Sequence, residues 1–121
     1  MKKNNQTDFI SDGTLYSVYT YRTKDGLHYY QFEYVYIPEG YYEIDIISQP
    51  SYTNRNSSMG IVHRLSSPRD GRDFIVCISK DIKTSITLQK AKNISIEWAE
   101  LTSKYIRTGI TIDNQIAAYS N

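Results

Sequence analysis

The chain contains a single cysteine, Cys77, and this scarcity limits the chemistry that it can hold. One cysteine excludes an internal disulfide framework and any metal site built from several cysteines. No apolar run approaches the roughly 20 residues that a membrane-spanning helix needs. The first seven residues begin with two lysines, but no apolar signal core follows them. We therefore expect a cytoplasmic protein without a disulfide or a membrane span.

The chain also lacks an excess of charge of either sign. Lys and Arg number 14 and Asp and Glu number 13, which leaves a formal net charge of +1. Such a balance argues against a partner held mainly by charge, such as a nucleic acid or a membrane surface. The sequence has no Gly-rich phosphate loop, no metal-ligand spacing and no Gly-x-Ser-x-Gly motif. We expect neither a cofactor nor a metal.

The length of 121 residues suits one domain, spanning residues 1–121. Residues 1–13 are polar and are predicted to be flexible or a short lead-in. Beyond them, alternating apolar and polar residues, with Asp-Gly and Pro-Glu-Gly turns between the segments, predict antiparallel strands. The predicted strands are residues 15–22, 27–37, 41–48 and 74–79. Residues 49–60 read as a polar loop, and residues 61–65 as a short extended piece.

Helical periodicity begins late in the chain. The apolar stripe of the predicted helix consists of Ile94, Trp98, Leu101 and Tyr105. Asn93 is the predicted N-cap and Gly109 the residue that ends the helix. Residues 82–91 fit either a strand or a helix, and residues 110–121 either an extra helix or a frayed end. The predicted fold is α+β, a four-stranded antiparallel meander with a C-terminal helix packed on one side.

Tyrosine is abundant where phenylalanine is not, at 12 residues against three, and ten of the tyrosines lie between Tyr16 and Tyr52. Tyrosine favours strands, and its hydroxyl tolerates partial exposure. The composition therefore favours a sheet with one half-exposed aromatic face. The alternative is a contact surface, because tyrosine is enriched in protein interfaces.

Cys77 is the strongest candidate for chemistry. Its neighbours Ile75, Val76 and Ile78 are typical of a small buried hydrophobe. Strand alternation nevertheless places the thiol on the outward face if Val76 points into the core. A reactive thiol also needs a nearby cation or a helix N-terminus. The candidate cations are His63, Arg64, Arg69, Arg72 and Lys80.

His63 is the second candidate, because a Cys–His pair with a third orienting group is the arrangement of a thiol hydrolase. The third group could come from Asp70, Asp73 or Asn93. His28 lies among strand tyrosines and is predicted to be structural. Glu43 and Asp45 share one strand face, and we expect this face to be solvated rather than to form an acid/base pair or a metal foothold.

The order of these elements resembles the bacterial ubiquitin-conjugating-enzyme-like family found in cyclic-oligonucleotide-based antiphage defence (CBASS) operons. The residues that carry the resemblance are 42–46 (Tyr-Glu-Ile-Asp-Ile), Pro50, Tyr52, 63–65 (His-Arg-Leu), 76–78 (Val-Cys-Ile), Trp98, Tyr105 and 108–109 (Thr-Gly). The match runs in order over residues 27–109. Arg64 and Leu65 follow His63, where eukaryotic enzymes of this kind carry His-Pro-Asn.

The resemblance implies a catalytic Cys77 that forms a thioester and passes a protein C-terminus to an amine or a target protein. His63 would lie near it and shape the loop or the oxyanion region. The implied partners are proteins, either a nucleotidyltransferase or a ubiquitin-like donor. The alternative is a catalytically silent binding module or scaffold of the same fold that uses the Tyr-rich sheet.

Overall fold

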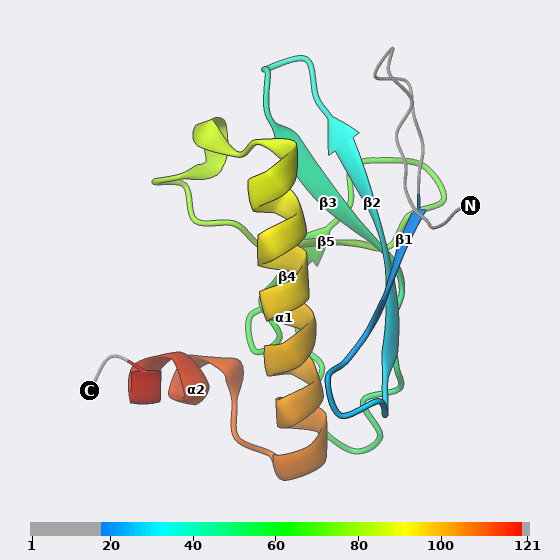
Figure 1. Ribbon diagram of the computed structural model, residues 1–121, viewed down its shortest axis with the longest axis vertical. Coiled ribbons are helices and arrows are strands. Elements are labelled where there is room, and N and C mark those ends of the chain that lie inside the picture. Colours follow the sequence, from blue (N-terminus) through cyan, green and yellow to red (C-terminus); the bar gives the residue numbers. More distant parts are fainter. Residues whose placement is uncertain (1–17, 120–121) are drawn as a thin grey trace.

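The structure is a computed structural model that describes residues 18–119. It is an α+β fold in which one long helix crosses a single face of an antiparallel sheet (Figure 1). The predicted lead-in at residues 1–13 and the start of the first predicted strand lie outside the described residues. The elements are β1 (Val18–Arg22), β2 (Tyr29–Tyr36), β3 (Tyr42–Ser48), β4 (Arg64–Ser66), β5 (Phe74–Val76), η2 (Lys83–Ser85), α1 (Leu88–Thr108) and α2 (Ile112–Tyr119).

Within residues 18–119 the sheet has five strands in the order β1-β2-β3-β5-β4, rather than the four predicted. Strands β1 to β3 form the predicted meander, but β5 then pairs with β3 and leaves β4 at the edge. β4 has only three residues, and Leu65 pairs with Ile75 of β5. So short a strand shows no alternation of its own, which is why the pattern predicted only a short extended piece there. β5 is equally short: it ends at Val76, three residues before the predicted end at residue 79.

The long helix α1 begins at Leu88, six residues before the predicted first helical residue, Ile94. Thr87 is the N-cap, and its side chain accepts a hydrogen bond from the Lys90 amide at 3.2 Å, so the predicted Asn93 cap is wrong. Residues 88–92 are mostly strong helix formers, which allows the helix to extend back to this cap. The predicted end is confirmed, because Gly109 has φ +80° and donates its amide to the Tyr105 carbonyl at 2.8 Å. The undecided residues 82–91 divide between η2 and the first turn of α1.

The core lies between β2, β3 and the inner face of α1. Tyr30, Phe32 and Tyr34 are almost completely buried there, and Trp98 of α1 packs edge-on against two of their rings. The Trp98 ring lies 5.7 Å from that of Tyr30 and 6.0 Å from that of Phe32, centroid to centroid. Edge-to-face contacts of this kind add to the stabilisation from burial alone. The buried positions that face the sheet from α1 include small residues, namely Ala91, Ser95, Ala99, Thr102 and Ser103.

Hydroxyl groups join this sheet face to the helix. The Tyr34 and Tyr30 hydroxyls lie 2.7 Å from the Oγ atoms of Ser95 and Ser103, respectively. Ser95 donates its own proton to the Lys92 carbonyl at 2.8 Å, so Tyr34 is the donor to Ser95. Tyr30 and Tyr34 of β2 therefore bury their rings and satisfy their hydroxyls on the helix, whereas Tyr19 and Tyr21 of β1 are partly buried. The expected half-exposed aromatic face is wrong for the part of the sheet that holds Tyr30 and Tyr34.

We predict that Tyr34→Phe lowers the free energy of unfolding by about 1 kcal/mol, because it leaves the Ser95 oxygen without its donor inside the core. Urea unfolding measures this change. The matched control is Tyr29→Phe, since Tyr29 is 55% exposed, and it should cost less than about 0.5 kcal/mol. Equal losses in the two variants would show that the buried hydroxyl contributes nothing.

We also predict that the protein loses stability in alkali. Burial raises the pKa of Tyr30 and Tyr34 well above the ordinary value of 10.0, and raises the pKa of Tyr52 to about 12. Because the folded-state values exceed those of the unfolded chain, the stabilisation is complete below about pH 10 and is lost as the pH rises toward the folded-state values. Each such tyrosine removes about 1.4 kcal/mol per pH unit in that window.

Urea unfolding repeated from pH 8 to pH 11.5 tests this behaviour. Tyr34→Phe should reduce the slope above pH 10. A free energy of unfolding that stays constant across this range would contradict the assignment.

Candidate functional site

Cys77 is the first residue after β5, and its side chain is exposed. Val76 before it is 3% exposed and points into the core, which confirms the outward placement that strand alternation predicted. The Cys77 amide donates to the His63 carbonyl at 2.9 Å, one hydrogen bond beyond the last β4–β5 pair. The thiol is therefore accessible while its backbone is held at the end of the sheet.

A groove of about 340 Å³ runs beside Cys77. Most of its lining is apolar, and two lysines, Lys80 and Lys83, border it. The apolar lining residues are Tyr41, Tyr42, Leu65, Ile75, Val76 and Ile78. The groove also contains Glu43, whose carboxylate lies 3.0 Å from the Arg69 guanidinium, which it shares with Asp45. The two lysines therefore leave the groove with a positive border.

The backbone carbonyl of His63 is hydrogen-bonded to Cys77, whereas its imidazole is hydrogen-bonded to a residue of α2. The Nε2 atom lies 2.7 Å from the Asp113 Oδ1 atom in the first turn of α2. His63 has φ +53°, a left-handed conformation that is uncommon for a residue with a side chain. The partner of the imidazole is thus Asp113, which sequence reasoning missed in favour of Asp70, Asp73 and Asn93. Thr111 is the feature of the sequence that could have indicated α2, and with it Asp113. Its Oγ1 atom accepts a hydrogen bond from the Asn114 amide and so caps the start of that helix.

A hydrogen bond from α1 holds the segment that carries His63. The Trp98 Nε1 atom donates to the Val62 carbonyl at 2.8 Å, and Val62 is completely buried. The next carbonyl along the chain, that of His63, accepts the Cys77 amide. The core tryptophan therefore connects to the backbone of Cys77 through two successive residues of one buried segment.

The acidic pair on β3 is enclosed rather than solvated, contrary to expectation. Asp45 is completely buried, and the Arg69 Nε atom lies 2.6 Å from its Oδ2 atom. Ser67 donates to the other oxygen of Asp45 at 2.8 Å. Burial alone would lower the pKa of Arg69, but its bonds to Asp45 and Glu43 raise that pKa above its ordinary value. These carboxylates bind the loop between β4 and β5 to the outer face of the sheet, so they serve structure.

Of the other candidate cations, Arg64 and Arg72 bond to groups other than the thiol, and Lys80 lines the groove. Arg64 stacks on the rings of Tyr52 and Phe74, at 5.0 and 3.8 Å from their centroids. Arg72 pairs with Glu33 at 2.5 Å. Lys80 is therefore the one predicted cation that lines the Cys77 groove, and Lys83 is a second that the sequence did not indicate.

His28 is structural, as predicted, because its Nδ1 atom lies 2.8 Å from the Ser103 hydroxyl under α1. Among residues 18–119, no group of three His, Cys, Asp or Glu side chains is arranged to hold a metal ion. Within the same residues, neither helix is both long and apolar enough to cross a membrane. Comparisons of the chain with protein-family models, curated proteins and solved structures gave no match.

Proposed function

We propose that this protein is a ubiquitin-conjugating-like acyl carrier in bacterial antiphage defence. It forms a thioester at Cys77 and passes a protein C-terminus to an amine or a target protein. The observation that carries the proposal is the exposed thiol of Cys77, placed directly after a core strand and beside an apolar groove. A proposed ubiquitin-conjugating-like fold agrees with an antiparallel sheet that carries its long helix on one face.

The proposed reaction has two balanced steps. The Cys77 thiolate attacks the activated carbonyl carbon of the donor, a carbon–sulfur bond forms, and the leaving group departs with its electron pair. An amine of the acceptor then attacks the thioester carbonyl, a carbon–nitrogen bond forms, and Cys77 leaves as a thiolate. The amine gives its surplus proton to solvent. An exposed thiol is required for both steps, because each partner is a macromolecule that must reach the sulfur.

The groove beside Cys77 suits the last residues of such a donor. Leu65, Ile75 and Ile78 offer apolar contacts for the side chains that precede the donor's C-terminus. Lys80 and Lys83 on the border favour a donor segment that also carries acidic residues. A ubiquitin-like protein and a nucleotidyltransferase are the proposed protein partners.

His63 acts in this proposal as a positioning residue. Its carbonyl accepts the Cys77 amide, and its imidazole bonds to Asp113. The loop around the thiol is thereby connected to the first turn of α2. The shaping role for His63 that the resemblance implies would come from its backbone.

The second candidate is a catalytically silent binding module of the same fold. Tyr36 is 57% exposed and lies 5.0 Å from the Tyr42 ring, at a point where Tyr42 also borders the Cys77 groove. This pair would supply the contact surface of the binding module, whereas Tyr30 and Tyr34 are buried under α1. The two candidates differ in whether the thiol accepts an acyl group.

A peptide that ends in a glycine thioester tests the proposal by thiol–thioester exchange, followed by intact-mass spectrometry. The matched control moves the thiol two residues along the same border, as Cys77→Ala/Ser79→Cys, since Ser79 is exposed in the same groove. We expect wild type to gain the peptide acyl mass at least about tenfold faster than this control, because the hydrogen bond from the Cys77 amide to the His63 carbonyl holds Cys77 at the end of the sheet. Hydroxylamine should remove the added mass, and Cys77→Ala should gain none.

Prior labelling of both thiols with a small disulfide reagent establishes that the two are equally accessible. Equal acylation rates at positions 77 and 79 would reject the carrier function. That outcome would favour the binding module.

A further inference from the structure

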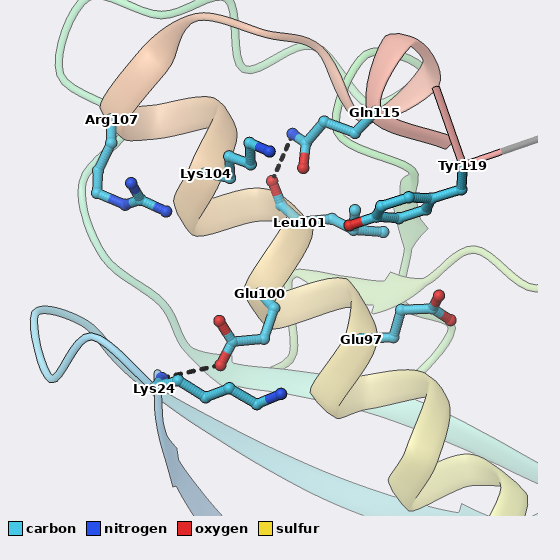
Figure 2. Close-up of a pocket in the computed structure, with 8 residues that line it drawn as sticks. All are labelled: Lys24, Glu97, Glu100, Leu101, Lys104, Arg107, Gln115 and Tyr119. Atoms are coloured by element: carbon cyan, nitrogen blue, oxygen red, sulfur yellow. Dashed lines mark hydrogen bonds between the residues drawn. The ribbon is translucent and has the colours of Figure 1, made fainter. Parts of the chain in front are cut away.

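A second pocket lies away from Cys77, between α1, α2 and the β1–β2 turn (Figure 2). Its volume is about 250 Å³, slightly below the range of roughly 300–1,000 Å³ typical of drug-sized ligands. A pocket of this size suits a small metabolite. Its polar lining includes Lys24, Glu97, Glu100, Lys104 and Gln115.

Gln115 of α2 supplies the strongest sign that the pocket binds a ligand. Its side chain is 3% exposed, and its Nε2 atom donates to the carbonyls of Leu101 at 3.0 Å and Ile110 at 2.9 Å. These two acceptors fix the orientation of the amide, because a flipped amide would place its oxygen against both carbonyls. The Oε1 atom is then buried without a hydrogen-bond partner in the described part of the chain. Figure 2 shows this oxygen on the side of the amide that faces the Tyr119 ring.

A buried amide oxygen without a donor is costly, so a ligand that brings an N–H group there gains a favourable interaction. The other charged groups show what else the ligand would carry. Glu100 is already occupied, because it accepts from the Tyr21 hydroxyl and from the Lys24 amide at 2.9 Å. Arg107 is also occupied, because its Nε atom lies 3.1 Å from the Asp25 Oδ2 atom. Glu97 and Lys104 are exposed, and within residues 18–119 neither of these side chains has a partner, nor does the ammonium group of Lys24.

Unpartnered groups of both signs therefore line one small pocket. Glu97 and the Gln115 oxygen accept hydrogen bonds, whereas Lys24 and Lys104 donate them. A ligand with a single charge would satisfy one of these sets and leave a like charge close to the other. A zwitterion satisfies both. Leu101 and the Tyr119 ring add an apolar wall to the same pocket.

We propose that this pocket binds a free α-amino acid with an apolar side chain. Its ammonium group donates to the Gln115 Oε1 atom and to the Glu97 carboxylate. Its carboxylate accepts from Lys104, and its side chain packs against Leu101 and Tyr119. The proposal uses none of the residues assigned to acyl transfer, so it stands or fails separately from the proposed function.

L-leucine is the probe, titrated into the ¹⁵N-labelled full chain and followed by NMR. We expect saturable shifts of the Gln115 side-chain amide and of the Glu97 and Lys104 backbone amides. Isoamylamine lacks the carboxylate of leucine, and 4-methylpentanoate lacks its ammonium group. Each should bind at least about tenfold more weakly, because each loses a hydrogen bond between charged groups.

Two exposed substitutions separate binding from folding. Glu97→Gln and Lys104→Gln should each weaken leucine binding about tenfold without changing the unfolding midpoint. The matched controls are Glu39→Gln in the β2–β3 turn and Lys90→Gln at the other end of α1, and both should bind as wild type does. The proposal is overturned by an absence of saturable shifts up to about 10 mM leucine. It is equally overturned if isoamylamine or 4-methylpentanoate binds as tightly as leucine.

Discussion

The packing of hydroxyl-bearing tyrosines against a helix face of small residues is the interaction on which the rest of the structure depends. Tyr30 and Tyr34 bury whole rings, and each can do so because Ser103 or Ser95 of α1 receives its hydroxyl. A phenylalanine face would fill the same space but would remove one hydrogen bond from each of these buried serines. Trp98 lies in the middle of this face, so one helix serves as both the cover of the sheet and the anchor of the segment beside the thiol.

The fold followed from the sequence wherever the chain signals its structure locally. The Asp-Gly turn predicted the first hairpin, and Gly109 with its positive φ predicted where α1 ends. The sequence predicted only a short extended piece where β4 lies, because three residues form a strand only through pairing with β5. The start of α1 was misplaced since Asn93 and Thr87 are both good caps, and the helix-forming residues 88–92 extend the helix back to Thr87.

The site was less predictable than the fold, because it depends on contacts between distant segments. Alternation from Val76 correctly placed Cys77 on the surface. The imidazole of His63 bonds to Asp113, which lies 50 positions away and in a helix that the sequence left undecided. Arg69 was a candidate partner for the thiol, yet it binds the buried Asp45, which no local pattern revealed. Opposite charges far apart in sequence find one another only once the sheet has formed.

The central claim is that α1 holds Cys77 in place through Trp98, whose indole donates to the Val62 carbonyl next to His63. Native-state hydrogen exchange of the Cys77 amide in Trp98→Phe tests it most directly. Ile44→Val is the control, because Ile44 belongs to the same core but is not one of the two rings against which Trp98 packs. At matched global stability, we predict that the Cys77 amide exchanges at least about tenfold faster in Trp98→Phe than in the control. Equal exchange in the two variants would contradict the account.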